Sequence, residues 1–288
     1  MNDPPSRRSR PWPTLADRYV LGPDGRGVSP ICLGATVSPD VLCEAFDAGI
    51  NFFFVTCDMH WPRYEMCRRG LERLLARRRS LRDEIVVAAV TYLTQPEFCW
   101  KPLDELIEVL PSLRSIDMCV AGGVYNRDWP HRRAVLDEQR QQRYLGAWSI
   151  GASFHERAAA VKAINEPAVD LAFVRYNPRH PGARRDLFPR LRAEGGALVY
   201  NFNSAHAYVR PSRFPSLGLS QQHWQPEVTD YYRFALTRPE IGGLLVALDT
   251  PGHVAELVDA LGRGPLSPEE ERYLLDLGKL DMGTYRLA

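Results

Sequence analysis

The stretch "GINFFFVTCDMHW" (residues 49–61) joins a strongly apolar segment to a short polar one. Its run "INFFFVT" (50–56) is rich in aromatic and β-branched residues, and it predicts a strand that is buried on both faces. Four side chains with functional groups follow directly: Cys57, Asp58, His60 and Trp61. In parallel barrels the active site lies at the carboxyl ends of the strands, so this junction predicts a site.

Outward from this stretch, strand and helix patterns alternate along the whole chain. Apolar runs predict strands at 29–35, 50–56, 84–93, 116–122, 145–153, 169–177, 197–202 and 242–248. Amphipathic patterns predict helices at 38–49, 63–79, 103–113, 132–143, 155–166, 183–195, 228–240 and 251–262. The first helix has Ser38 as its N-cap and Gly49 at its C-terminal end. Eight strand–helix pairs predict an α/β fold, a single (β/α)8 TIM barrel.

The flanking segments complete this fold. The segment 18–30 predicts a β-hairpin ahead of the barrel, and Ser267 with Glu270 predicts a capping box that starts an extra C-terminal helix. We expect a flexible N-terminal arm at 1–13 and one barrel at 14–288. The segment 204–226 is too long for an ordinary connector, and we expect it to cover the active face. An open doubly wound sheet is the alternative, but no Gly-x-Gly-x-x-Gly follows the first strand.

The composition argues against several classes of partner. The chain has 288 residues and a formal net charge of +1, so no overall field favours nucleic acid. No apolar run approaches the roughly 20 residues that cross a bilayer, and the start has no apolar signal-peptide core. The six cysteines are therefore expected to be reduced. We expect a cytoplasmic protein that binds a small-molecule or peptide substrate, without nucleic acid or membrane.

Several short motifs follow the order found in one known family. They are "RYVLGPDGRGVSPICLGA", "AFDAGINFF", "YEMCRRGLERLL", "DEIVVAA", "SLRSIDM", "SIGASF", "VRYN" and "LSPEEE". In this order they resemble the aldo/keto reductase superfamily over nearly the whole barrel. The resemblance implies a TIM barrel and, in ordinary members, NADPH-dependent reduction of a carbonyl group.

The same resemblance places the family's catalytic tetrad on residues of other types. The position of the aspartate falls on Phe54, and that of the tyrosine on Met59 or, with a one-residue slip, on His60. The position of the lysine falls on Val90 and that of the histidine on Gly122. The resemblance therefore implies a divergent member that lacks the Asp-Tyr-Lys-His tetrad.

The family's cofactor positions are altered as well. Those that contact the nicotinamide fall on Ser153, Phe154, Phe173 and Tyr200. Those that grip the adenosine phosphate fall on Asp249 and Leu257, and a carboxylate there would repel a 2′-phosphate. We predict no cofactor, and weak or no binding of NADP, with Tyr200 as the ring contact if a nicotinamide binds.

The ends of the predicted strands nominate the site residues. The catalytic candidates are His60, Asp58 and Tyr92, because an imidazole suits acid–base chemistry near neutral pH and a nearby carboxylate can orient it. The substrate-binding candidates are Trp61, Tyr125, Ser153, His155, Arg175, Asn177, Asn201 and Asn203.

Each candidate also has a structural interpretation. His60 can bond to its own loop, His155 can cap the fifth helix, and Arg175 can pair with Asp58 or Glu65. The asparagines can tie loops together.

A metal site is a further alternative to an organic one. Cys57, His60, Cys67, His155 and His180 offer sulfur and imidazole ligands, but their spacing matches no closed zinc pattern. Cys67 falls inside a helix, where a buried cysteine behaves as a small apolar residue. We therefore predict no metal.

Three functions follow from these patterns. The first is a biosynthetic enzyme of specialised metabolism that works by acid–base chemistry such as cyclisation, elimination or isomerisation, with His60 as the proton carrier. The second is a nicotinamide-dependent reductase in which Tyr92, Tyr125 or His60 replaces the proton donor. The third is a non-catalytic barrel that binds a ligand or a partner, and a mouth filled by Phe54, Phe154 and Phe173 would favour it. Fold alone does not rank them.

Overall fold

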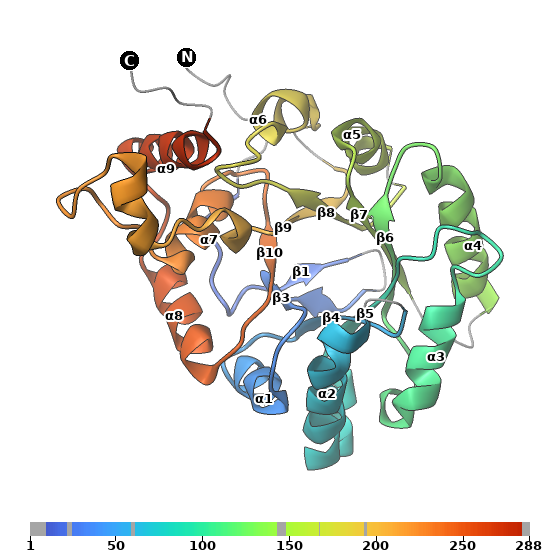
Figure 1. The fold of residues 1–288 in the computed structure, drawn as a ribbon. Coiled ribbons are helices and arrows are strands. Elements are labelled where there is room, and N and C mark those ends of the chain that lie inside the picture. Colours follow the sequence, from blue (N-terminus) through green and yellow to red (C-terminus); the bar gives the residue numbers. More distant parts are fainter. Residues whose placement is uncertain are drawn as a thin grey trace.

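The computed structural model describes residues 10–21, 25–58, 61–142, 148–166, 168–192 and 195–283. Within these ranges, eight parallel strands form a closed barrel in the order β10-β3-β4-β5-β6-β7-β8-β9. Figure 1 shows the barrel at the centre of the molecule with the helices around it. The predicted (β/α)8 barrel is thus confirmed.

The elements follow the predicted alternation closely. The barrel strands are β3 Ile31–Leu33, β4 Phe52–Thr56, β5 Val86–Thr91, β6 Met118–Val124, β7 Ser149–Phe154, β8 Leu171–Arg175, β9 Leu198–Phe202 and β10 Gly243–Val246. The helices are α1 Pro39–Asp47, α2 Glu65–Arg77, α3 Lys101–Val109, α4 Trp129–Gln142, α5 Arg157–Asn165, α6 Ala183–Asp186, α7 Val228–Leu236, α8 Pro251–Gly262 and α9 Pro268–Asp281.

The predicted helix ends are confirmed where side chains set them. Ser38 accepts a hydrogen bond from the backbone of α1, and Gly49, just beyond that helix, has a φ of +106° that favours glycine. Ser267 and Glu270 form the predicted capping box of α9.

The helix predicted at 183–195 is wrong in its length. Within the described part of this segment, 183–192 and 195, the α-helix α6 ends at Asp186, and a 3-10 turn at Phe188–Arg190 follows it. Pro189 explains the break, because a proline lacks the N–H that a helix needs and disfavours helical backbone in the residue before it.

Side chains alternate between the barrel interior and the helix layer. In β4, Phe52 and Phe54 point inward while Phe53 and Val55 pack under the helices. The predicted hairpin, β1 (Tyr19–Val20) with β2 (Gly27–Val28), is antiparallel, and Val28 belongs to the interior cluster. The described interior is therefore a packed core, and a cavity opens at its carboxyl end.

The described part of the N-terminal arm and the long segment 204–226 both pack against the outer helices. Residues 1–9 of the predicted arm lie outside the described ranges, whereas the Trp12 indole donates to the Leu261 carbonyl of α8 over 2.7 Å. The long segment 204–226 is attached to α9, because Tyr273 donates to the Trp224 carbonyl and Arg213 pairs with Asp281. It contributes no residue to the mouth cavity described below, contrary to expectation.

Two further findings concern chemistry and location. All six cysteines are free and buried. No helix within the described ranges combines the length and the apolar character needed to cross a membrane.

Candidate active site at the barrel mouth

A cavity of about 280 Å³ opens at the carboxyl ends of the strands. Its floor and one wall are apolar, from Phe54, Phe202, Leu245 and Val246. Its polar side chains are Arg63, Tyr64, Tyr92, Ser153, His155, Arg175 and Asn203. None of the described residues that line it is an aspartate or a glutamate. The mouth therefore carries cationic and phenolic groups without a neutralising carboxylate.

Two tyrosines form a hydrogen-bonded pair on one side of this cavity. Tyr92 follows β5, Tyr64 precedes α2, and their phenol groups share a hydrogen bond. Burial raises the pKa of both groups, most strongly that of Tyr64. The bond from Tyr64 and the charge of Arg63 act in the opposite direction on Tyr92, because both favour its phenolate. Burial and the charge of Asp58 outweigh these two effects, so the pKa of Tyr92 is raised and the side chain is a neutral phenol at pH 7.

Asp58 holds the backbone of Tyr92 in place through a hydrogen bond. Its carboxylate accepts a hydrogen bond of 2.5 Å from the Tyr92 backbone N–H, and its side chain is only 7% exposed. The Tyr92 ring in turn lies against Gly122, where an added Cβ would come within 2.6 Å of the ring carbons. Only glycine leaves room for this ring. Asp58 is therefore a positioning residue, and Tyr92 fills the space in front of β6.

Arg175 ends β8 and reaches the cavity beside Phe202. Its guanidinium carbon lies 5.6 Å from the centre of the Phe202 ring. Its Nε is buried without a hydrogen-bond partner among the described residues. Glu65 pairs with Arg68 and Arg69 instead, and no described ion pair joins Arg175 to Asp58 or Glu65. The salt-bridge alternative is therefore wrong, and no described carboxylate pairs with Arg175.

His155 directly follows β7 and lies at the rim. Its ring stacks on Tyr125 with centroids 5.4 Å apart, and its outer edge faces Phe202. Partial desolvation and then the nearby Arg175 lower the pKa of His155, so the imidazole is neutral at pH 7. The cap of α5 is Glu156, so the alternative that His155 caps this helix is wrong.

Two predicted binding residues lie in the wall rather than in the cavity. Asn201 is fully buried, accepts from the Tyr176 N–H over 2.7 Å and donates to Ser204 over 2.6 Å. Asn177 is also fully buried and donates to the Asn203 carbonyl over 2.8 Å. These two amides tie the loops after β8 and β9 together, which is the structural interpretation predicted for Asn201. Asn203 itself lines the cavity and has a φ of +60°.

Tyr200 does not reach the mouth. Its ring is fully buried in the layer below, edge-on to Phe173 at 6.0 Å, and its hydroxyl donates to the Ser29 carbonyl over 2.6 Å. This position corrects its prediction as a contact for a nicotinamide ring. The ring of β9 that lines the cavity is Phe202.

Part of the predicted site lies beyond the described structure. Met59 and His60 are outside the described residues, and the side chain of Trp61 is not described. The roles predicted for His60 and Trp61 stay predictions. Among the described residues, no group of three or more histidine, cysteine or acidic side chains is arranged to hold a metal ion.

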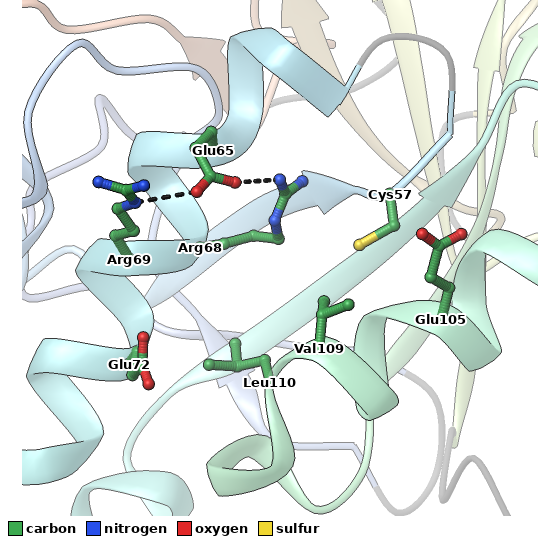
Figure 2. Close-up of a pocket in the computed structure, with 8 residues that line it drawn as sticks. All are labelled: Cys57, Glu65, Arg68, Arg69, Glu72, Glu105, Val109 and Leu110. Atoms are coloured by element: carbon green, nitrogen blue, oxygen red, sulfur yellow. Dashed lines mark hydrogen bonds and ion pairs between the residues drawn. The ribbon is translucent and has the colours of Figure 1, made fainter.

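Cys57 faces away from the mouth. Figure 2 shows its thiol in a groove of about 310 Å³ between α2 and α3, beside Arg68 and Glu105. The alternation of β4 explains this direction, because Cys57 continues the outward series of Phe53 and Val55. Burial raises the pKa of the Cys57 thiol to about 11, although Arg68 opposes this. Cys57 is thus a protonated thiol and a poor nucleophile at neutral pH.

Cys57 should consequently react slowly with iodoacetamide. At pH 8 a thiol with a pKa of about 11 is mostly protonated, so we expect alkylation roughly 100-fold or more slower than that of free cysteine. Peptide mapping by mass spectrometry gives the rate at this residue, and the same reaction in denaturant is the control. Alkylation at the rate of free cysteine in the folded protein would show a thiolate and contradict this assignment.

The lining residues that escaped the sequence-based prediction include Arg63, Tyr64 and Phe202. The pattern placed Arg63 and Tyr64 at the start of a predicted helix, whereas they lie in a short 3-10 helix before α2. Phe202 could have been found from the alternation of β9, because Leu198 and Tyr200 point inward and Phe202 continues their series.

Comparisons with known proteins locate this barrel among known folds. No protein-family model matches the chain, and no curated protein matches it. Among solved structures, the chain is similar to the holo form of an aldo-keto reductase from Bacillus halodurans, with a TM-score of 0.67 and 14% sequence identity. The match covers 91% of this chain and 95% of the other. The chain therefore has the (β/α)8 barrel fold of the aldo/keto reductases.

Proposed function

We propose that the chain is an enzyme that catalyses proton transfer on a small molecule held in the barrel mouth, without hydride transfer. The outcome would be an isomerisation, an elimination or a cyclisation. The observation that carries this proposal is the hydrogen-bonded pair of Tyr64 and Tyr92 at the cavity.

Tyr92 is the proton donor in this proposal. A donor must be protonated before the reaction and must tolerate the negative charge afterwards. Burial and the charge of Asp58 keep Tyr92 protonated, while the hydrogen bond from Tyr64 and the Arg63 charge offset part of the cost of forming its phenolate. The proton then moves from the Tyr92 hydroxyl to an oxygen or carbon of the substrate.

An imidazole is the matching base. His155 lines the cavity and is neutral at pH 7 because its pKa is lowered. His60 is the candidate from the sequence, and it follows Asp58 by two residues. Either can accept the proton that the substrate loses.

The residues at the family's tetrad positions support chemistry other than hydride transfer. Phe54 lines the cavity floor and Val90 is fully buried in the interior cluster. Gly122 has no side chain, and Tyr92 occupies its space. A lysine–aspartate pair that tunes a tyrosine is not provided at these positions.

The positions that would hold a nicotinamide nucleotide do not fit it either. Tyr200 and Phe173 are buried below the mouth, and Phe154 faces outward against Trp129 at 5.7 Å. Leu257, aligned with a phosphate contact, is fully buried in α8. We therefore derive no step through this cofactor.

The reductase and the non-catalytic barrel predict different properties of the barrel mouth. A reductase with a substituted donor would also use Tyr92, so cofactor binding separates it from our proposal. The aromatic plug that would favour a non-catalytic barrel is not formed by Phe154, which turns away from the open cavity. A barrel that only binds a ligand is separated from our proposal by the turnover test below.

NADPH should bind weakly or not at all. A titration followed by the fluorescence of the reduced nicotinamide should show no saturation at micromolar concentration, with a nicotinamide-dependent reductase as the positive control. Saturable binding in this range would favour the reductase.

Turnover itself is tested by incubating the protein with mixed organic acids and carbonyl compounds without nucleotide. Mass spectrometry with chromatographic separation should show a product of unchanged mass, or one that has lost water. Conversion that requires NADPH would overturn the proposal.

A further inference from the structure

The charge of Arg175 is the least satisfied feature of the cavity. Its Nε is buried without a partner, and no carboxylate among the described residues pairs with its guanidinium. The rest of the side chain is partly exposed and lines the open cavity, so the guanidinium can still reach a molecule bound there. A buried donor without a partner is costly, and an anion bound beside Arg175 would offset this cost.

The neighbours of Arg175 report its positive field. His155 and His180 both lie close enough for the charge of Arg175 to disfavour their protonated forms. Arg63 lines the same cavity and has no ion pair among the described residues. The cavity thus has a positive potential, which attracts and orients an anion.

The rest of the cavity favours a flat apolar body. Phe202 lies beside the guanidinium, and Phe54 forms the floor next to the Tyr64 ring, with centroids 6.2 Å apart. Leu245 and Val246 add aliphatic surface. The volume of about 280 Å³ suits a compact molecule, at the lower limit of typical ligand pockets.

We infer that the mouth binds a small carboxylic acid with a flat, unsaturated or aromatic body, and that Arg175 pairs with its carboxylate. A planar guanidinium matches a carboxylate through two parallel hydrogen bonds. The inference rests on the proposed function and names its substrate class. In this orientation the body of the acid lies over Phe54 and within the same cavity as Tyr92.

The test uses 4-fluorobenzoate as the probe and 19F NMR as the readout. The wild-type protein should broaden and shift the signal of 4-fluorobenzoate, and it should have little effect on 4-fluorobenzamide, which has the same shape without the charge. Inorganic phosphate is the competing anion. We expect it to displace the probe poorly, because it lacks the apolar body.

Variants then assign the binding to Arg175. Arg175→Gln should weaken the binding of 4-fluorobenzoate by about 10- to 100-fold, since it removes a charge-assisted pair. Arg175→Lys should lose less affinity than Arg175→Gln, because lysine keeps the positive charge and loses only the pair of parallel hydrogen bonds. Arg272→Gln, on the exposed face of α9, is the matched control and should bind as the wild type does. Thermal unfolding of each variant shows whether the barrel is intact.

Several outcomes would overturn the inference. Equal affinity for the acid and its amide, or unchanged binding by folded Arg175→Gln and Arg175→Lys, would exclude the pair. Binding of phosphate but not of 4-fluorobenzoate would exclude the carboxylic acid. A failure of the proposed function would give a different result. Tyr92→Phe would then keep its turnover, while the binding of 4-fluorobenzoate would still depend on Arg175.

Discussion

The Tyr92→Phe variant should lose about 10²- to 10⁴-fold in turnover while keeping its fold. The change removes only the hydroxyl, and the ring that packs against Gly122 stays. Tyr64 also lines the cavity, but its pKa is raised more strongly than that of Tyr92, so it is the poorer proton donor and should not replace Tyr92. The rate of substrate consumption at saturation measures the loss.

The partner of Tyr92 gives a second readout that a merely structural role would not change. Tyr64→Phe removes the hydrogen bond that lowers the pKa of Tyr92, so the pKa of Tyr92 should rise. Because a proton donor is active only below its pKa, the alkaline limb of the pH–rate profile should move to higher pH. Tyr273→Phe on α9 is the control for loss of a phenol elsewhere.

The comparison with His60 decides which group carries the proton. If His60→Gln is inactive and Tyr92→Phe is fully active, the donor is the histidine that the sequence suggested, and Tyr92 only shapes the cavity. If both variants are inactive, the two act as acid and base. Full activity of both would exclude acid–base chemistry by either.

The sequence predicts this site better through strand alternation than through residue chemistry. Arg175 and Phe202 fall in the inward series of β8 and β9, and both line the cavity. Asn201 is as polar as Arg175 but belongs to the outward series, and it ends in the wall. Chemistry alone nominated both Asn201 and Arg175, whereas alternation separates them.

Other features depended on contacts that no local pattern contains. The bond between Tyr64 and Tyr92 joins residues on different loops, and the fit of Tyr92 against Gly122 joins neighbouring strands. The barrel itself was predictable, because eight repeats of apolar strands and amphipathic helices allow few other closed arrangements.

Asp117→Ala should destabilise the barrel by about 3–5 kcal/mol, the range found when one partner of a buried ion pair is removed. Asp117 precedes β6 and is 1% exposed; its carboxylate accepts from Arg82 over 3.0 Å and from the Val87 N–H over 2.7 Å. Arg82 is itself 6% exposed and donates to the carbonyls of Leu113 and Ser115. Removing the carboxylate therefore leaves a buried guanidinium without its counter-charge.

Two further variants separate the loss of charge from the loss of packing. Asp47→Ala breaks an ion pair with Arg77 of similar length, 2.9 Å, but both side chains are largely exposed. It should cost no more than about 1 kcal/mol. Replacing both buried partners, Arg82→Met with Asp117→Leu, should recover part of the loss, because no buried charge is then left unpaired.

Urea unfolding of the wild type, Asp117→Ala, Asp47→Ala and the double variant measures these free energies of unfolding. The binding of 4-fluorobenzoate shows whether the cavity at the mouth is intact. Asp117 precedes its strand and so lies at the amino end of the barrel, opposite the cavity. Folded Asp117→Ala should therefore keep the affinity of the wild type for the probe. A loss of stability equal to that of Asp47→Ala would show that water reaches Arg82 in solution, and that the amino end of this barrel is not held by a buried charge pair.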